Sequence, residues 1–400
     1  MKVALVIERI EAWRGGAETS TMQFAHHLAD GGCDVSVVTT SHAPSTPSMT
    51  IVPIQAGAGS RAGKTTRFAR RAADYVCRHP FDVVHCITPC PAADVYQPRG
   101  GTVPEMLERN RALRSGRLPR GLKRLAQRMN PKMAVMSGLE RDLLNRQPPP
   151  WVIAISQYVA DQLARHYRTD PSRVRRIFNG VDPDDASTEQ RERDRREIRR
   201  QFGIGTDDLF VLCIAHNFKL KGVARLIEAL ARREARPDGD RSTPASVRAV
   251  IVGRDNPAPY ARLAQRLGLT DRVLFAGPTQ RIGAFFHAAD LLAHPTYYDP
   301  CSRVVLEGLA AGLPVITTRF NGAAERITDG REGYVIDSPT DVDDLADRID
   351  RLADPQHRRD CAGHAPGTVE HITMKQHAAD VRELYEDVVA QGKESRRAYR

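Results

Sequence analysis

Short apolar runs alternate with amphipathic helical segments along nearly the whole chain, and this alternation constrains the fold more than any other feature. It begins with an apolar run at residues 2–7, a helical pattern at 18–29 and a valine-rich run at 34–40. Another apolar run follows at 82–87. Strands separated by helices are typical of a parallel sheet that is covered by helices on both faces. The amino-terminal half is therefore predicted to be an α/β domain.

A dense charge run divides the chain. Residues 184–201 read DDASTEQRERDRREIRRQ, a composition that is typical of a solvated helix or linker. The alternation resumes after this run with a strand expected at 209–215. We therefore predict a first domain over 1–184, a charged linker over 185–204 and a second αβα domain over 205–369.

Composition limits the kind of protein and its partners. Hydrophobic residues make up 41% of the 400 residues, which excludes a disordered chain. No stretch of about 18 apolar residues lacks charge, and Glu8 and Arg9 interrupt the apolar start. We therefore predict a cytoplasmic chain. Seven scattered cysteines without a CxxC pair predict no disulfide framework.

The positive charge favours an anionic partner. The formal net charge is +10, from 59 Lys and Arg against 49 Asp and Glu. Such an excess suits nucleic acid, nucleotide phosphates or an anionic membrane. Aromatic residues are only 6% and no recognition motif is present, so nucleic acid is not the partner we expect. The segment from Arg99 to Arg128, with leucines among its basic residues, is a candidate for peripheral membrane contact.

Several segments could bind phosphate or metal. Residues 58–65, Ala-Gly-Ser-Arg-Ala-Gly-Lys-Thr, fit a relaxed P-loop pattern, but the loop follows the third expected strand rather than the first, so we do not expect nucleotide hydrolysis there. Gly15 and Gly16 connect the first strand to the first helix, where a backbone can approach an anion. Lys219 and Lys221 follow the first strand of the second domain. His85, Cys86 and Cys90 could suggest a metal site, although buried small residues explain them better.

Two acids in the second domain carry the most specific signal. Asp299 follows an apolar run, and Glu307 lies eight residues later inside an apolar helical segment. A carboxylate among Val305, Leu306 and Leu309 is costly without a partner, and a ligand hydroxyl would supply one. The intervening amides would lie at a helix N-terminus, where phosphate binds.

These acids and the following segment Leu-Ala-Ala-Gly-Leu-Pro-Val-Ile (309–316) resemble retaining glycosyltransferases of family 4. The resemblance implies the GT-B fold, two Rossmann-like αβα domains facing across a cleft. It extends over most of the chain, through the motifs at 14–18, 178–182, 221–222, 321–325 and 330–333. Within the family, the chain is similar to the lipopolysaccharide core glucosyltransferases that act on heptose, through residues 93–96, 253–257 and 294–297 and the long basic insertion before Trp151.

The resemblance implies roles for individual residues. Glu307 would bind the ribose hydroxyls of a nucleotide-sugar donor, Asp299 the hydroxyls of the transferred sugar, and Lys221 the diphosphate. Asp94 would lie near the acceptor and the reacting carbon. The remaining donor-binding positions are expected to be Gly15, Gly16, His216, Lys219, Ile282, Ser302, Arg303 and Val304.

The resemblance also implies substrates and a metal-independent reaction. It suggests UDP-glucose as donor and a saccharide or glycolipid such as lipopolysaccharide core as acceptor. No metal is expected, because basic residues and helix ends would neutralise the departing diphosphate. The last segment, 370–400, would pack back on the first domain. Trp13 could contact the acceptor, or it could simply pack beside its turn.

Three positions depart from the family pattern and keep alternatives open. Asp299 replaces Glu, His216 replaces Arg with Lys219 as a substitute cation, and Ser302 replaces Gly. His216 would make donor binding sensitive to pH. The alternatives are a nucleotide-sugar-binding relative with weak catalysis, and a phosphorylase or epimerase of the same architecture.

Overall fold

The computed structural model describes residues 1–10, 16–42, 45–46, 48–114, 129–236 and 246–398, and six further positions (116, 119, 121, 123, 126 and 127). The chain forms two compact units. The first contains Met1–Gly180 and Met374–Arg400, and the second contains Val181–Thr373. Each unit is built on one parallel sheet, so the predicted α/β class with two Rossmann-like domains is confirmed.

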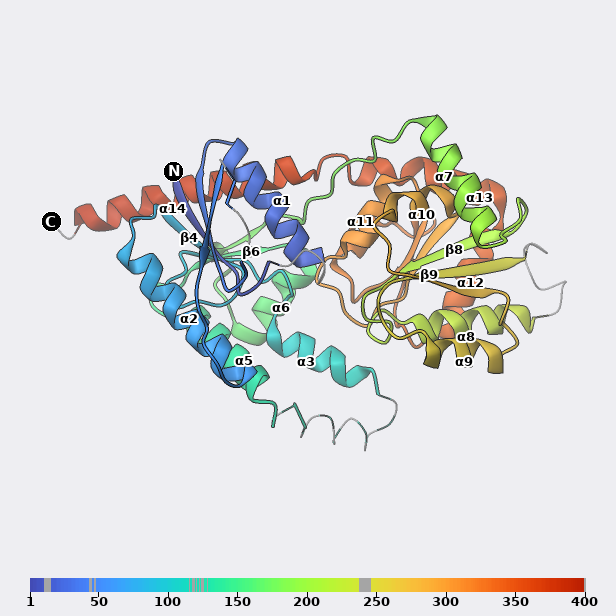
Figure 1. The fold of residues 1–400 in the computed structure, drawn as a ribbon, viewed down its shortest axis with the longest axis horizontal. Coiled ribbons are helices and arrows are strands. Elements are labelled where there is room, and N and C mark those ends of the chain that lie inside the picture. The colour runs from blue at the N-terminus through green and yellow to red at the C-terminus, as the bar shows by residue number, and fades with distance from the viewer. Residues whose placement is uncertain are drawn as a thin grey trace. The chain divides into compact units, whose positions relative to one another are not determined.

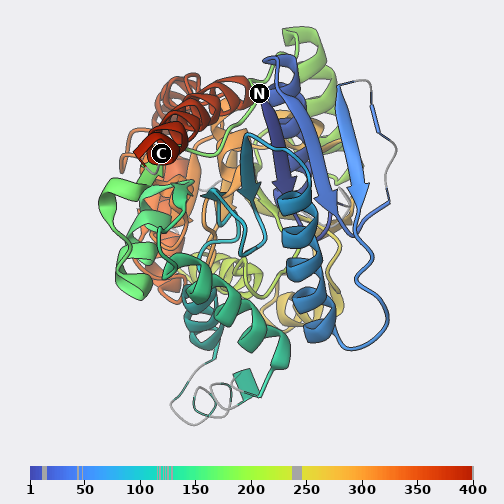
Figure 2. The ribbon, with the colours of Figure 1, turned by 90° about the vertical axis from the view of Figure 1, so that its left-hand side faces the viewer.

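The first unit has a seven-stranded sheet in the order β3-β2-β1-β4-β5-β6-β7. Its central strands are apolar because helices cover both faces, and Figure 2 shows the blue strands running in the same direction. The chain order changes direction between β1 and β4, the position where parallel sheets usually bind ligands. The elements are β1 (Lys2–Val6), α1 (Gly16–Asp30), β2 (Asp34–Thr39), β3 (Met49–Pro53), α2 (Arg61–Arg78), β4 (Val83–Cys86), β5 (Val95–Tyr96), α3 (Val103–Ala112), α5 (Pro131–Leu144), β6 (Trp151–Ala154), α6 (Gln157–Tyr167), η2 (Pro171–Arg173), β7 (Val174–Arg176) and α14 (Met374–Ala398).

Helix α14 belongs to the first unit although it ends the chain. It packs beside α1, as Figure 1 shows. Val381, Leu384 and Tyr385 share one core with Phe24 and Leu28 of α1. The chain enters the second unit after Gly180 and leaves it before Met374, four residues from each predicted boundary.

The second unit has a six-stranded sheet in the order β10-β9-β8-β11-β12-β13. Helices α8 and α12 contribute to the core on one face together with β8 and β9. Figure 1 shows α8 and α9 on one side of the sheet and α10 and α11 on the other. The elements are α7 (Thr188–Gln201), β8 (Leu209–Ile214), α8 (Val223–Glu234), β9 (Val247–Val252), α9 (Ala258–Arg266), β10 (Val273–Gly277), α10 (Ile282–Ala288), β11 (Leu291–His294), α11 (Arg303–Ala310), β12 (Val315–Thr318), η4 (Gly322–Arg326), β13 (Gly333–Ile336), α12 (Val342–Ala353), α13 (Pro355–His364) and η5 (Pro366–Thr368).

The predicted linker over 185–204 is wrong. Most of it is α7, which packs on α10 within the second unit. Two arginines of the charge run make this attachment. Arg195 donates to Asp290 at 2.7 Å, and the buried Arg199 donates to Asp290 at 3.0 Å and to the Asp208 carbonyl at 2.7 Å. A run of charges can therefore be structural when its residues find buried partners.

Replacing Arg199 should destabilise the second unit. The change Arg199→Met leaves the Asp290 carboxylate, only 9% exposed, with one cation fewer. Loss of one member of a buried pair costs about 3–5 kcal/mol. Arg196→Met is the matched control, because Arg196 is 70% exposed on the same helix. This substitution should change the free energy of unfolding by less than about 0.5 kcal/mol. Urea unfolding measures both, and equal midpoints would contradict a structural role for α7.

The P-loop-like segment is part of a helix and its cap. Helix α2 begins at Arg61, within this segment, and the Ser60 hydroxyl caps it by accepting from the Gly63 amide. The Arg67 guanidinium donates to the carbonyls of Ala56 and Ala58. The loop thus directs carbonyl oxygens toward a cation, whereas a phosphate cradle needs amides.

None of the helices within the described residues is both long enough and apolar enough to cross a membrane.

Candidate functional site

The carboxyl ends of β8 and β11 meet where the strand order of the second sheet reverses. This is the position at which open parallel sheets usually bind ligands. The turn after β8 carries Lys221, and the loop after β11 carries Asp299. The sheet therefore brings together two of the predicted site residues.

Lys221 and Asp299 form a direct ion pair. Lys221 Nζ lies 2.5 Å from Asp299 Oδ2 and 3.4 Å from the Tyr298 carbonyl oxygen. Burial alone would raise the pKa of Asp299, but Lys221 and then His294 outweigh it and hold the pKa well below its usual range. Asp299 is therefore ionised at neutral pH, with one oxygen committed to the lysine.

His294 is a member of this group that sequence reasoning did not single out as functional. It ends β11, is 1% exposed, and places Nε2 3.6 Å from Asp299 Oδ2. Burial lowers its pKa, with Lys221 acting in the same direction and Asp299 opposing them. The available signal was an imidazole at the end of the apolar run Leu-Leu-Ala-His.

The predicted acid Glu307 lies on α11, one turn after the start of that helix. Arg303 Nη2 approaches Glu307 Oε1 at 3.2 Å. Burial raises the pKa of Glu307 despite this arginine, and the Asp182 carboxylate acts in the same direction. Arg303 and Val304 form the first turn of α11, the part of a helix that favours an anion.

Ser302 has a structural role that explains one departure from the family pattern. Its hydroxyl caps α11 by accepting from the Val305 amide at 3.4 Å, and its own amide donates to Asn321 Oδ1 at 3.1 Å. The Ser302 residue is only 3% exposed. The hydroxyl is thus used within the protein, where it stabilises the start of α11.

A cavity of about 320 Å³ joins Glu307 to the predicted residue Ile282. Ile282 begins α10, so the cavity lies between α10, the second half of α11 and the entering segment of the unit. Its apolar lining with a few carboxylates is typical of small-molecule sites. The remaining lining residues are Asp182, Asp184, Gly283, Phe286, His287, Ala310 and Ala311.

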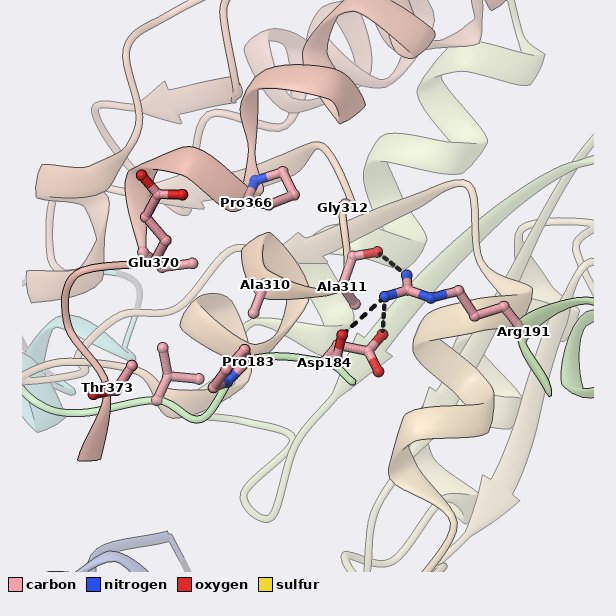
Figure 3. Close-up of a pocket in the computed structure, with 11 residues that line it drawn as sticks. Pro183, Asp184, Arg191, Ala310, Ala311, Gly312, Pro366, Glu370 and Thr373 are labelled. Carbon is pink, nitrogen blue, oxygen red and sulfur yellow. Dashed lines mark hydrogen bonds and ion pairs between the residues drawn. The ribbon is translucent and has the colours of Figure 1, made fainter. Parts of the chain in front are cut away.

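A second cavity, of about 270 Å³, shares a wall with the first. Asp184, Ala310 and Ala311 line both. Figure 3 shows Arg191 pointing to Asp184 and to the carbonyl of Ala311, and these contacts measure 3.0 Å and 3.3 Å. Arg191 therefore fixes the common wall, and its guanidinium is committed to protein acceptors.

A polar cluster next to this wall was also not predicted from the sequence. The His287 ring lies between two carboxylates, with Nε2 3.0 Å from Asp184 and Nδ1 2.8 Å from Asp194. Arg281 contacts Asp194 at 3.2 Å. The cluster links α7, α10 and the entering segment, so the same charge run that was read as a linker helps to shape the first cavity.

The other predicted cations of the second unit lie on the same turn as Lys221. His216 and Lys219 are exposed on the turn after β8. The turn itself is held by Asp255, which accepts from the Phe218 amide at 2.8 Å, and by Asn217, which accepts from the Leu220 amide at 3.0 Å. Both side chains are therefore accessible to a ligand.

The expected role of Asp94 is not supported by its position. Its carboxylate accepts from the Val84 amide at 2.8 Å, and its carbonyl accepts from Trp151 at 2.9 Å. Asp94 precedes β5, so it lies at the amino ends of the strands, whereas ligands of parallel sheets bind at the carboxyl ends. It joins three neighbouring strands.

Gly16 starts α1 after β1, as predicted, while Trp13 and Gly15 lie outside the described residues.

The basic segment from Arg99 to Arg128 is not a uniformly exposed helix. Arg99 is buried, and its guanidinium donates to Ser20 at 2.6 Å and to Gln97 at 3.0 Å. Arg109 pairs with the buried Glu105 at 3.0 Å on α3. The leucines at 118, 122 and 125 lie outside the described residues, so membrane contact by that part stays a prediction.

The histidine and cysteines near β4 are core residues. His85 Nδ1 meets the Tyr385 hydroxyl at 2.5 Å, and the Cys90 thiol donates to the Ala69 carbonyl at 3.6 Å. Burial raises the pKa of Cys86 well above its usual value, which disfavours the thiolate that metals bind.

One group elsewhere in the described part has the spacing of metal ligands. Glu105, Glu108 and His166 lie close together on α3 and α6. Arg109 and Arg165 already form ion pairs with both carboxylates. These guanidinium groups neutralise the charge that would attract a metal, so we assign none, and metal independence of the reaction stays an expectation.

Two family models match successive parts of the chain. The Glycosyltransferase Family 4 model matches residues 14–185, and the model for glycosyl transferases group 1 matches residues 194–366. Together with the two parallel sheets, these matches show that the chain belongs to the family 4 glycosyltransferases of GT-B type.

Known relatives agree with this assignment. The lipopolysaccharide glucosyltransferase WaaG of Escherichia coli K12 is 27% identical over 376 residues, which are 93% of this chain and 92% of the relative. D-inositol 3-phosphate glycosyltransferase 2 of Catenulispora acidiphila is 33% identical, over 55% of this chain and 51% of its own length.

Solved structures share the fold. A crystal structure of WaaG superposes with a TM-score of 0.78 at 24% identity, covering 96% of this chain and 99% of that one. Anabaena HepE in complex with UDP-glucose superposes with a TM-score of 0.71 at 19% identity, covering 97% and 100%.

Proposed function

We propose that this glycosyltransferase moves a hexose from a nucleotide-sugar donor to a saccharide or glycolipid acceptor, with retention of the anomeric configuration. UDP-glucose is the donor to test first, because a fold relative binds it, and lipopolysaccharide core is the acceptor class suggested by WaaG. One observation supports the proposal most: Lys221 and Asp299 meet where the sheet order reverses, and Glu307, eight residues after Asp299, lines a cavity.

In this proposal the second unit contacts three parts of the donor: the nucleoside, the diphosphate and the transferred sugar. The nucleoside occupies the cavity between Ile282 and Glu307, with the Glu307 carboxylate accepting from the ribose hydroxyls. The diphosphate meets Lys221 and the first turn of α11 at Arg303 and Val304. Asp299 accepts hydrogen bonds from hydroxyls of the transferred sugar.

The proposed chemistry needs charge stabilisation and orientation. The bond from the anomeric carbon to the diphosphate breaks while the acceptor hydroxyl attacks the same face, and the departing phosphate takes the hydroxyl proton. The lysine and the helix start stabilise the charge that develops on the diphosphate. The two acids hold the sugar and the ribose in place for attack. A double displacement would instead require a carboxylate nucleophile below the ring.

Donor binding by Glu307 gives the direct test. We expect calorimetry with UDP-glucose, UDP-galactose, UDP-N-acetylglucosamine and GDP-mannose to find one donor that binds clearly better than the rest. Glu307→Ala should weaken this binding by at least about tenfold, the usual loss for hydrogen bonds to a charged group. Glu192→Ala is the control, because Glu192 is 62% exposed on α7.

The outcomes separate the alternatives. Binding without turnover toward any saccharide acceptor would indicate the weakly catalytic relative, and turnover with inorganic phosphate as acceptor would indicate a phosphorylase. Product analysis by NMR reports retention or inversion. Failure of every sugar nucleotide to bind would contradict the proposal.

A further inference from the structure

The His294 side chain is a buried polar group whose hydrogen-bonding capacity is unused. Neither Nδ1 nor Nε2 has a hydrogen-bond partner among the described residues, although the residue is only 1% exposed. The nearest polar atom given for it is Asp299 Oδ2, at 3.6 Å from Nε2. Buried polar atoms are normally satisfied, and leaving one unsatisfied is unfavourable. This imidazole therefore requires an explanation.

The backbone around His294 is firmly held, so its place beside Asp299 is built into the fold. The Thr317 hydroxyl donates to the His294 carbonyl at 2.9 Å. The Tyr297 amide and the Thr296 hydroxyl donate to the Leu220 carbonyl at 2.9 Å and 3.2 Å. The loop after β11 and the turn that carries Lys221 are thus joined by hydrogen bonds.

Among the residues that the structure describes, Lys221 is the cation in close contact with Asp299. Lys221 contacts the same Oδ2 that His294 faces at longer range. The proposed function requires Lys221 to bind the donor diphosphate. Asp299, whose side chain is 15% exposed, would then lose the cation that stabilises its charge. A largely buried carboxylate without a partner is strongly unfavourable.

We propose that His294 is a positioning residue that replaces Lys221 as the partner of Asp299 when the donor binds, and that it takes up a proton from solvent in doing so. This inference rests on the proposed function. Closing the 3.6 Å separation would give Asp299 a charge-assisted hydrogen bond and leave its other oxygen for the sugar hydroxyls. Lys221 can then move from Asp299 to the diphosphate without leaving a buried carboxylate unpaired.

The groups around His294 favour this exchange. Asp299 and Lys221 are the charged groups that face it. On the neighbouring strand β12, Thr317 stands in register with it, and on α11 the ion pair of Arg303 and Glu307 lies on the covering helix. In the free protein, burial and Lys221 keep the pKa of His294 low. When Lys221 binds the anionic diphosphate, its positive charge is neutralised and no longer lowers the pKa of His294. The pKa of His294 is therefore higher in the complex than in the free protein.

This rise in the pKa of His294 on donor binding determines how donor affinity depends on pH. The complex binds a proton that the free protein does not, so donor affinity is highest at low pH and falls as pH rises through the pKa that His294 has in the complex. The fall should occur at a higher pH than the one at which His294 titrates in the free protein, because burial and Lys221 lower the pKa of the imidazole there.

The test is calorimetric titration of the full chain with UDP-glucose in two buffers of different ionisation enthalpy near neutral pH. An intact sugar nucleotide carries no group that titrates there, so proton uptake reports on the protein. We expect uptake approaching one proton in the natural sequence. His294→Gln, which can donate a hydrogen bond but cannot be protonated, should abolish the uptake and flatten the pH dependence. His364→Asn, a change to an exposed histidine on α13 of the same unit, should leave both unchanged.

Several outcomes would overturn the inference. Donor binding without proton uptake in the natural sequence does so without any variant, and it leaves the proposed function intact. Uptake that persists in His294→Gln, or that disappears in His364→Asn, assigns the proton to another group. Absence of binding by any sugar nucleotide contradicts the proposed function and this inference together.

Discussion

Lys221→Ala should lower kcat/KM by about 100-fold or more, the usual effect of removing one preorganised charge contact from a transition state. The lysine is placed for this role by two elements, the end of β8 and the start of α8, and it reaches Asp299 across the point where the strand order reverses. Its loss removes a cation from the diphosphate and leaves the Asp299 carboxylate without its present partner. Steady-state kinetics with saturating acceptor would measure the effect.

The neighbouring lysine provides the control for this variant. Lys219, an expected donor cation, is exposed two residues earlier on the same turn and lacks the ion pair of Lys221 with Asp299, so Lys219→Ala should lower kcat/KM by less than Lys221→Ala does. The thermal unfolding midpoint of Lys221→Ala should be measured as well, because a folded but inactive protein separates catalysis from stability. Unchanged kinetics in Lys221→Ala would refute the assignment.

Gly222→Ala should destabilise the second unit by about 3 kcal/mol or more, because it adds a steric clash to an unfavourable backbone conformation. Gly222 has φ +73°, and a Cβ there would lie 2.0 Å from the Pro295 carbonyl oxygen. Pro295 directly follows His294, so the substitution would push the turn carrying Lys221 away from the loop after β11. Donor affinity should fall together with stability.

Gly268→Ala separates the backbone strain of a positive φ from the steric clash. Gly268 has the same φ of +73°, but a Cβ there would meet nothing within 4 Å. It should therefore cost only the backbone strain, about 1–2 kcal/mol, and leave donor affinity unchanged. The shift in urea unfolding midpoint measures both variants. Equal shifts would show that contact between the two turns is unimportant.

Much of the fold could be predicted because the relevant signals are local. Apolar runs such as Leu209–Ile214 become buried parallel strands, and glycine-containing turns join them to helices. Parallel strands place their carboxyl ends at one edge. Residues that follow strands, such as Lys221 and Asp299, could therefore be expected at one site without knowledge of their distance.

Charged residues were the least predictable, because the same side chain can be solvated or buried with a partner. The run at 184–201 reads as a linker, yet Arg199 is buried beside Asp290. Arg99 reads as part of a basic surface, yet it is buried against Ser20 and Gln97. Asp94 reads as an acid near a substrate, yet it holds the backbone of β4. Composition carries no information about such partners when they are distant in the sequence.

The sequence by itself determined the α/β class, the two sheets and the acids Asp299 and Glu307, since hydrophobic periodicity and short motifs act over a few residues. Tertiary structure alone decided which side chains meet. Lys221 and Asp299 are 78 positions apart, and only the adjacency of β8 and β11 brings them together. His294 ends β11 and Asp299 lies on the loop after it, and the contacts of this loop with Leu220 and Thr317 set the 3.6 Å between them, because a buried loop takes its path from the partners that its polar groups find.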